Sequence, residues 1–399
     1  MASSDVGVRI GLEQISQSIP SVMQGTRLGL LMNQSSVDHN LRYSCDVLSD
    51  AFPRKLTTLF TPQHGLWGEQ QANMIESSHT THPQLGIPVH SLYSETRKPT
   101  PEMLKDVDCF VVDLQDVGTR VYTFIWTISH CLEACAEAGV PVVILDRPNP
   151  LGGYIVEGPM LDVGQESFVG RACIPMRHGL TLGELSQVVN CLMEIGAELY
   201  AVPMSGWQRS MNWCETGRKW VWPSPNVPRP ESCLVYPGMV LLEGTNLSEG
   251  RGTTLPFEVF GAPFIDPHAL ASKLREYSLP GVEFLPLRFV PTFDKWKGIS
   301  CGGLLLNITD PATFQPVLTS VLSLAVIRSL WPKDFDWLTP PYEYETEKPP
   351  IDIIAGTARL RKAIDSLEAG ESPTRAEFEQ LIAFDQAAWH ELCRPHLLY

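Results

Sequence analysis

Apolar and polar positions alternate in a regular way along the first 150 residues. Short continuous apolar runs indicate strands buried on both faces, and apolar residues at helical spacing indicate helices. The predicted strands cover 27–33, 55–60, 88–92, 109–113 and 141–145, and the predicted helices cover 9–24, 40–51 and 124–138. This alternation is typical of α/β proteins, so we expect a Rossmann-like, doubly wound parallel sheet.

The pattern changes near residue 150, where a Gly- and Pro-rich stretch begins. Thr181 and Glu184 form a capping-box pattern that predicts a helix to about Ile195. Further expected elements are strands at 199–203, 282–290 and 302–309, and helices at 267–277, 311–330, 354–368 and 374–391. We therefore predict a Rossmann-like N-terminal domain over 1–150 and a second, smaller α/β domain over 151–399. The second domain is expected to carry long cleft-forming loops at 205–265 and the C-terminal helices.

Polar side chains gather where the predicted strands end. Five polar residues lie within the eight positions from 113 to 120, at and just after the end of the strand at 109–113: Asp113, Gln115, Asp116, Thr119 and Arg120. The other strand ends carry Asn33, Gln63, His64, Asp146, Arg147 and Asn149. Because parallel strands place their ends at one edge of a sheet, we expect one crevice to collect these groups. The alternative is that Asp116 and Thr119 cap the next helix and Arg120 neutralises them.

The stretch 205–265 has little regular pattern but many groups that suit ligand binding. A segment this long without regular structure is usually functional. Its polar candidates are Asn226, Glu243, Asn246, Glu249 and Arg251, and its tryptophans are Trp207, Trp213, Trp220 and Trp222. Tryptophans beside carboxylates and amides suit sugar binding, because a pyranose presents apolar faces and hydroxyl edges. Each of these tryptophans could equally belong to the core.

Composition excludes several classes of function. The net charge of −15 argues against nonspecific nucleic-acid binding, which needs clustered basic surface. The sequence shows neither a signal peptide nor an apolar run long enough to cross a membrane, so we expect a cytoplasmic protein. The ten cysteines include no Cys-x-x-Cys pair, which favours reduced thiols.

We also expect no metal and no nucleotide cofactor. His79 and His82 imitate a metal-binding pair, but no third ligand lies near them in the sequence. The first predicted strand is not followed by G-x-G-x-x-G, and no P-loop motif is present, so NAD, flavin or nucleotide binding is not expected.

Several motifs in a fixed order resemble one family. They are residues 61–65, 113–123, 145–153, 156–159, 177–184, 243–254, 257–258 and 261–264. With them the chain resembles the bacterial exo-β-N-acetylmuramidases, a glycoside hydrolase family long called a domain of unknown function. The resemblance runs from about residue 8 to Tyr399. It implies release of N-acetylmuramic acid from the non-reducing ends of peptidoglycan fragments, a site in a cleft between two domains, and no metal or nucleotide.

One position departs from that family. Many relatives carry glutamate where this chain has Gln63, and an amide cannot act as a general acid. Either another carboxylate serves, or the glutamine-bearing branch uses a different substrate or mechanism. A noncatalytic sugar- or muropeptide-binding protein is therefore the alternative to an enzyme.

Glycoside hydrolysis usually needs two carboxyl groups, although a substrate acetamide can replace the nucleophile. The catalytic candidates are Glu69, Asp113, Asp116 and Glu249, with Gln63 and His64 beside them. Arg120, Arg147 and Arg251 match the lactyl carboxylate of muramic acid, since guanidinium binds carboxylate in a bidentate way. Tyr122 could bond at the anomeric centre or simply pack. The remaining binding candidates are Asp146, Asn149, Asn226, Glu243 and Asn246.

Overall fold

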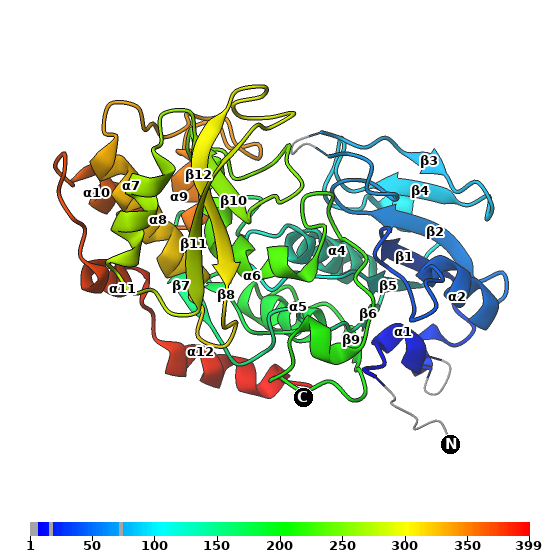
Figure 1. The fold of residues 1–399 in the computed structure, drawn as a ribbon. Coiled ribbons are helices and arrows are strands. Elements are labelled where there is room, and N and C mark those ends of the chain that lie inside the picture. The colour runs from blue at the N-terminus through cyan, green and yellow to red at the C-terminus, as the bar shows by residue number, and fades with distance from the viewer. Residues whose placement is uncertain (1–6, 16–18, 72–74) are drawn as a thin grey trace, which may run out of the picture.

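The computed structural model describes residues 7–15, 19–71 and 75–399, and its largest element is a seven-stranded sheet (Figure 1). The strands are β1 (Leu28–Met32), β2 (Leu56–Thr61), β3 (Thr80–Thr81), β4 (Pro88–Ser91), β5 (Cys109–Asp113), β6 (Val142–Leu145) and β9 (Leu199–Val202). Their order is β3-β4-β2-β1-β5-β6-β9, and only the β3–β4 pair is antiparallel. The chain winds outward in both directions from β1, which confirms the predicted doubly wound sheet.

Side chains of the central strands alternate between two hydrophobic cores. In β5, Cys109 and Val111 belong to one core, and Phe110 and Val112 belong to the other. Helices α1 (Gly11–Gln14) and α2 (Ser44–Ala51) pack on the first face, whereas α4 (Phe124–Ala138) and α5 (Leu182–Leu192) pack on the second. Burial on both faces explains why the strands read as continuous apolar runs.

Side-chain caps set the starts of several helices. The Thr181 hydroxyl accepts the N–H of Glu184, and the Glu184 carboxylate accepts the N–H of Thr181, so the capping box of α5 is confirmed. The predicted helix at 9–24 is wrong in length, because only α1 and the short turn η1 (Ser21–Met23) are helical. Pro20 disfavours helical backbone at the residue before it. Residues 16–18 of that prediction lie outside the described residues.

A second, smaller α/β unit follows the sheet in the chain. Its antiparallel sheet has the order β10-β12-β11, formed by β10 (Val259–Ala262), β11 (Val282–Phe289) and β12 (Cys301–Ile308). Helices α6 (Pro230–Met239), α7 (Pro267–Arg275) and α8 (Pro316–Leu330) pack against it and against each other. A two-stranded sheet, β7 (Glu157–Met160) with β8 (Pro175–Arg177), lies in sequence between β6 and β9 of the large sheet. The short helix α3 (Pro101–Leu104) precedes β5.

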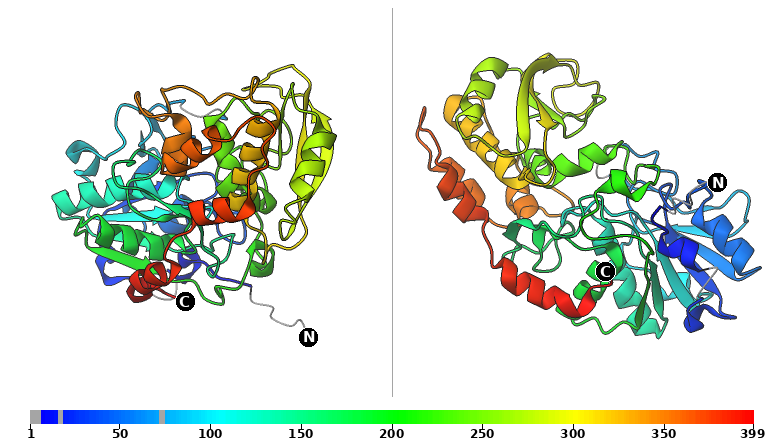
Figure 2. Two further views of the ribbon diagram at one scale, coloured as in Figure 1. Left: turned by 90° about the vertical axis from the view of Figure 1, so that its left-hand side faces the viewer. Right: turned by 60° about the horizontal axis from the view of Figure 1, so that its bottom comes forward.

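The C-terminal helices return to the first unit. The two predicted helices are four: α9 (Pro350–Ala355), α10 (Arg359–Asp365), α11 (Arg375–Ile382) and α12 (Gln386–Cys393). The short turns η2 (Trp213–Thr216), η3 (Val240–Gly244) and η4 (Arg394–His396) complete the helical elements. Figure 2 shows α11 and α12 running along the outside from the smaller unit to the C-terminus beside the large sheet. There the Tyr399 hydroxyl donates a hydrogen bond to Asp146 over 2.8 Å.

The large sheet extends past residue 150. Its strand β9 pairs with β6 in parallel register, so the sheet takes a strand from the segment that the sequence assigns to the second domain. The core on the α4 and α5 face also continues without a break into α6 and α8. The two units therefore share hydrophobic contacts rather than being joined by a free linker.

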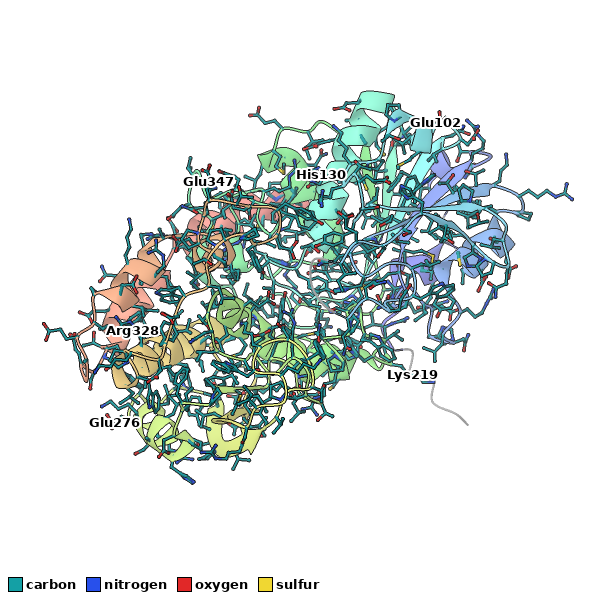
Figure 3. All side chains as sticks on the ribbon, turned by 90° about the horizontal axis from the view of Figure 1, so that it is seen from above. Glu102, His130, Lys219, Glu276, Arg328 and Glu347 are labelled. Carbon is teal, nitrogen blue, oxygen red and sulfur yellow. The ribbon has the colours of Figure 1, made fainter. Side chains whose placement is uncertain are left out.

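Charged side chains mark the outer surface of both units. Glu102, Glu276 and Glu347 lie at the periphery and are exposed (Figure 3). Within the described ranges, no helix has the length and apolar character that a membrane span requires.

Candidate active site

A small cavity of about 40 Å³ lies between the two units, at the carboxyl ends of β2 and β5. Gln63 and His64 follow β2, and Tyr122 and Thr123 stand just before α4. The second half of the chain supplies the other wall, with Ser224, Asn226, Tyr236, Glu243, Arg251, Phe257, Tyr342 and Glu343. The cavity thus collects polar groups from both units into one enclosed space.

Glu343 is a buried carboxyl group of this cavity, with 4% of its surface exposed. Burial is the main cause that raises the pKa of Glu343 to about 7, and the negative charge of Glu243 acts in the same direction. Hydrogen bonds from Tyr93 and Gln63, and the charge of Arg251, oppose this rise without cancelling it. The Tyr93 hydroxyl donates to Glu343 Oε2 over 2.9 Å. A carboxyl group with such a pKa carries a proton that it can release near neutral pH.

Gln63 orients this acid. Its Oε1 accepts a hydrogen bond from Thr123 Oγ1 over 2.9 Å, so its amide nitrogen is the group that donates to Glu343. An ionised glutamate at position 63 has no hydrogen to donate and would repel the Glu343 carboxylate. The glutamine is therefore compatible with an acid-bearing site, in which Glu343 rather than residue 63 holds the proton.

Glu243 belongs to a row of alternating charges that extends behind the cavity. Arg251 Nη2 lies 2.8 Å from Glu243 Oε1, and the Tyr342 hydroxyl donates to Glu243 Oε2 over 2.8 Å. Behind Arg251, the Glu249 carboxylate lies 3.4 Å from Arg251 Nη1 and 2.9 Å from Lys295 Nζ. Burial opposes ionisation of Glu249, but the charges of Lys295 and Arg251 outweigh burial and lower its pKa. The row fixes Arg251 between two carboxylates.

His64 is held as a neutral ring. Its Nδ1 lies 2.6 Å from the carbonyl oxygen of Gln70, which can only accept, so Nδ1 carries the hydrogen. The other nitrogen, Nε2, lies 3.2 Å from Ser224 Oγ and accepts from that hydroxyl. Burial, the largest cause, lowers the pKa of His64 to about 4, and the charge of Arg251 contributes. His64 therefore presents a lone pair, not a positive charge, to its surroundings.

The backbone around the cavity is strained at three places. His64, Phe257 and Glu343 adopt φ values of 74°, 65° and 43°, in the left-handed region that non-glycine residues rarely occupy. Such conformations cost about 1–3 kcal/mol each and cluster at functional sites. All three residues line the same cavity, which supports a functional role for this cavity.

Comparison with known proteins identifies the family. Two family models match, that of the N-terminal part of exo-β-N-acetylmuramidase NamZ over residues 28–231 and that of its C-terminal part over 234–399. Peptidoglycan β-N-acetylmuramidase NamZ of Bacillus subtilis strain 168 is 43% identical over 359 residues, which cover 90% of this chain and 84% of that protein. The chain belongs to the NamZ family.

Two solved structures share the fold of this NamZ-family chain. Both are DUF1343 family proteins from Bacteroides fragilis. The first has a TM-score of 0.88 at 31% identity and covers 99% of both chains. The second has a TM-score of 0.74 at 28% identity and covers 98% of this chain and 99% of its own. The two-unit architecture is therefore a property of the family.

Six of the residues singled out in the sequence line the cavity of this NamZ-family protein: Gln63, His64, Tyr122, Asn226, Glu243 and Arg251. Glu249 stands directly behind it, paired with Arg251 and Lys295. The expectation that Asp113 and Asp146 point into the same crevice is wrong, because both carboxylates are used in buried structural networks.

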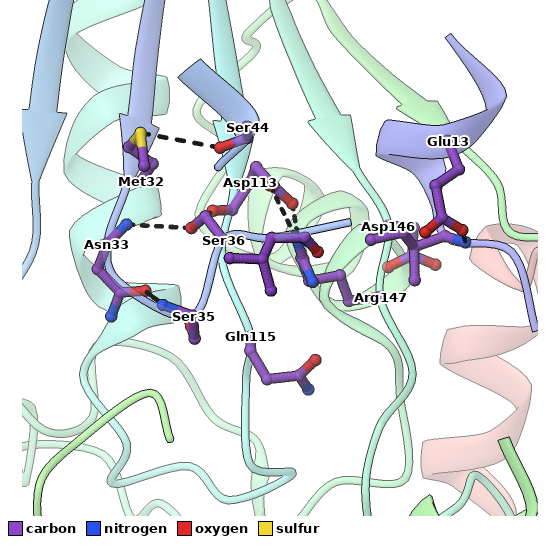
Figure 4. A network of polar contacts seen from close by, with 12 residues as sticks. Glu13, Met32, Asn33, Ser35, Ser36, Ser44, Asp113, Gln115, Asp146 and Arg147 are labelled. Carbon is purple, nitrogen blue, oxygen red and sulfur yellow. Dashed lines mark hydrogen bonds and ion pairs between the residues drawn. The ribbon is translucent and has the colours of Figure 1, made fainter. Parts of the chain in front are cut away.

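Asp113 forms a bidentate ion pair with Arg147 beside the end of β1. The Arg147 Nε and Nη2 atoms lie 2.6 and 2.8 Å from the two Asp113 oxygens, and both side chains are at least 96% buried (Figure 4). Arg147 Nη2 also donates to the carbonyl of Val37 over 3.0 Å. Ser36, which follows β1, donates to the Asp113 carbonyl. This network ties the ends of β1, β5 and β6 together.

Asp146 anchors the start of α5. It accepts hydrogen bonds from Thr181 Oγ1, the Gly183 N–H and the Tyr399 hydroxyl, at 2.7, 2.7 and 2.8 Å. Burial raises its pKa to about 6, against the effect of these hydrogen bonds. The carboxyl group thus joins the sheet, α5 and the C-terminus, away from the cavity.

Five further candidates lie outside the cavity. Arg120 donates to four backbone carbonyls, those of Pro159, Ile174, Ile354 and Ala355. Asn149 and Asn246 bond to backbone groups of neighbouring loops. Asp116 accepts the N–H of Gly118 and lies 3.5 Å from His178 Nε2, and Glu69 is exposed. Their fixed backbone partners, or the exposure of Glu69, explain why these groups are not directed at the cavity.

Several cavity residues escaped the sequence analysis. Tyr342 and Glu343 lie in a proline-rich segment that reads as a link between helices, and only the fold brings it to the strand ends. Tyr236 lies on α6, where the sequence predicts no helix. Trp207 and Trp213 are buried, whereas Trp222 is exposed, so the tryptophans divide between the two alternatives.

No metal centre is evident in the part of the chain that the structure describes. It contains no group of three or more His, Cys, Asp or Glu side chains in the arrangement of a metal site. His79 and His82 instead accept backbone N–H groups of Ser91 and Leu85.

Proposed function

We propose that this chain is an exo-acting glycoside hydrolase that releases terminal N-acetylmuramic acid, or a closely related 2-acetamido sugar, from peptidoglycan fragments. The observation that carries the proposal is the pair of carboxyl groups Glu343 and Glu243 in one cavity, in opposite environments. A buried carboxyl group with a raised pKa, beside a second carboxyl group that is ion-paired, suits an acid and its partner. The peptidoglycan β-N-acetylmuramidase of Bacillus subtilis, 43% identical, supports the choice of substrate.

Glu343 is the proton donor in this proposal. It gives its proton to the glycosidic oxygen as the bond from that oxygen to the anomeric carbon breaks, so the leaving sugar departs as a neutral alcohol. Its pKa of about 7 keeps it protonated in a substantial fraction of molecules near neutral pH. Gln63 and Tyr93 fix the direction of the carboxyl group through their hydrogen bonds.

Glu243 is the negative group that faces the sugar as positive charge develops at the anomeric carbon. The ion pair with Arg251 and the hydrogen bond from Tyr342 fix its position. Neutral His64 accepts the Ser224 hydroxyl at Nε2, and the Ser224 oxygen can in turn accept a hydrogen from the acetamide or from an attacking water. Either nucleophile then completes the bond at the anomeric carbon.

The cavity is smaller than the terminal sugar that it would have to hold. About 40 Å³ holds a few water molecules and not a complete sugar ring. The walls therefore have to part as a sugar enters. The segment from Tyr342 to Glu345, closed by two backbone hydrogen bonds between these residues at 2.9 Å, belongs to the wall that carries the acid.

Turnover assays test the proposal directly. We expect the protein to release the terminal sugar from an N-acetylmuramic acid–N-acetylglucosamine disaccharide and from an aryl N-acetylmuramide. Failure to cleave either substrate, combined with measurable sugar binding in calorimetry, would favour the noncatalytic binding protein. The predicted cytoplasmic location stays a prediction.

A further inference from the structure

Arg97 stands beside the proposed acid inside an aromatic box. Its guanidinium carbon lies 3.4 Å from the centre of the Tyr344 ring and 5.8 Å from the centres of the Tyr93 and Phe168 rings. These three rings also contact one another, with centroids 5.7 to 6.2 Å apart. Stacking on aromatic faces holds the guanidinium plane in one orientation.

The box borders the cavity at Glu343. Tyr344 follows Glu343 in the chain, and Phe168 precedes Val169, which also lines the cavity. Tyr93 links the box to the acid through its hydrogen bond to Glu343. A group bound at Arg97 would therefore lie next to the sugar that Glu343 protonates.

One edge of the Arg97 guanidinium is unused. Its Nε and Nη2 atoms are buried and have no hydrogen-bond partner among the residues that the structure describes. No Asp or Glu of the described ranges forms an ion pair with Arg97, in a protein with 45 acidic residues. Buried donors without acceptors are costly, so such an edge calls for a partner.

Other arginines of this protein show what that edge binds. Arg147 places Nε and Nη2 on the two oxygens of Asp113, at 2.6 and 2.8 Å. Arg361 does the same with Asp352, at 2.9 and 2.8 Å. Two parallel N–H groups on one side of a guanidinium match the two oxygens of a carboxylate.

The arginines that the sequence suggested for a substrate carboxylate are already engaged. Both Nη atoms of Arg120 donate to backbone carbonyls, Arg147 is paired with Asp113, and Arg251 is shared by Glu243 and Glu249. Arg97 is the guanidinium at this site whose bidentate edge has no acid against it within the described part of the chain.

We propose that Arg97 binds the lactyl carboxylate of the terminal sugar and thereby selects muramic acid over neutral 2-acetamido sugars. This inference rests on the proposed function, because it assigns a specificity residue to the same site. Entry of the sugar parts the wall that carries Tyr344, whose ring is 47% exposed, and the carboxylate then meets the Nε–Nη2 edge.

The test compares two aryl glycosides that differ only in the lactyl group, one with the carboxylate and one with a neutral carboxamide. We expect Arg97→Gln to lower kcat/KM for the carboxylate substrate roughly 30-fold or more, and for the carboxamide less than about threefold. Arg97→Lys should lie in between, because lysine keeps the charge but loses the paired N–H groups. Arg361 lies outside the cavity and is paired with Asp352. Arg361→Gln should therefore leave the ratio of the kcat/KM values of the two substrates unchanged.

Equal losses on both substrates would overturn the inference, because Arg97 would then act only by supporting Tyr344 and Glu343. Unchanged rates on both would overturn it as well. Binding of free N-acetylmuramic acid and of its carboxamide, measured by calorimetry, separates this inference from the proposed function. If the wild-type protein cleaves neither substrate, the proposed hydrolysis is refuted. A preference for the carboxylate in binding that disappears in Arg97→Gln would still support the role of Arg97, and the absence of any preference in the wild-type protein would refute it.

Discussion

Two groups of buried charges lie at the carboxyl edge of the large sheet, and they differ in how the charges are paired. Asp113 and Arg147 form a closed pair in which both carboxylate oxygens and one guanidinium edge are satisfied. Around the cavity, Glu243 and Glu249 share Arg251, and Glu343 accepts hydrogen bonds from Tyr93 and Gln63. Burial raises the pKa of Glu343 to about 7.

The difference teaches where chemistry is possible in this fold. A buried pair with matched charges stabilises the geometry of the strand ends but has no proton to give. Burial of a carboxyl group beside another negative charge leaves it protonated near neutral pH. Counting carboxylates at strand ends therefore does not find the site, whereas the surroundings of each carboxyl group do.

Replacing the proposed acid, Glu343, should have the largest effect on activity. We expect Glu343→Gln to lower kcat on the natural disaccharide by about a thousandfold, within the range of general acid catalysis. An activated aryl glycoside should lose much less, because its leaving group needs little protonation. The nearby Glu347, which is exposed, offers a control, since Glu347→Gln should leave both rates nearly unchanged. Equal losses on both substrates would assign Glu343 a role other than proton donor.

Breaking the matched pair should affect stability instead of chemistry. Asp113→Asn leaves the buried Arg147 charge unpaired, so we expect a loss of about 3–5 kcal/mol in the free energy of unfolding. Asp108→Asn breaks a bidentate pair of the same residue types with Arg27 at the surface and should cost less than about 1 kcal/mol. Urea denaturation measures both. The kcat of the folded Asp113→Asn protein should stay close to wild type, and a selective loss of kcat would contradict the comparison.

The pH dependence of kcat/KM sharpens the contrast. Glu343 must keep its proton, so activity should fall as the pH rises through about 7, and His64 must be neutral, so activity should fall below about 4. Gln63→Glu replaces a hydrogen-bond donor to Glu343 with a second negative charge. We expect it to move the alkaline limb upward by about one pH unit. An alkaline limb that stays in place, or moves down, would show that residue 63 does not act on the acid.

The smallest effect on activity is expected at Glu69, the exposed glutamate in the loop that follows Gln63 and His64. Glu69 has solvent around it and does not line the cavity, so Glu69→Gln should change kcat/KM by less than about threefold. Steady-state kinetics on the disaccharide would detect a larger loss, which would bring the 64–70 loop into the reaction.

The sequence predicts the sheet well because its signal is local. The apolar runs at 28–32, 56–61, 109–113 and 142–145 became strands, and the capping box at Thr181 and Glu184 set the start of α5. The two long helices predicted at 354–368 and 374–391 are four shorter helices, separated by turns that the local sequence pattern does not indicate. The segment 205–265 also contains α6 and β10, although its periodicity is weak.

The site was predictable only in part. Gln63, His64, Glu243 and Arg251 lie in family motifs, which is why they could be named in advance. Glu343 and Arg97 lie in segments with no pattern of their own, more than 240 residues apart, and their roles depend on contacts through Tyr93 and Tyr344. Asp113 and Asp146 show the converse, because the same residue types at strand ends served structure.

The most direct test of this account is the pKa of the Glu343 carboxyl group in the free protein. Carbon-13 NMR of the protein labelled at glutamate side-chain carboxyls, titrated from pH 4 to 9, should show a resonance with a midpoint near 7 that is missing from Glu343→Gln, whereas the resonance of Glu157, whose pKa burial also raises to about 7, should remain. That result would establish a protonated acid at the centre of the cavity. A Glu343 resonance that titrates near 4.5, as an ordinary glutamate does, would contradict the account.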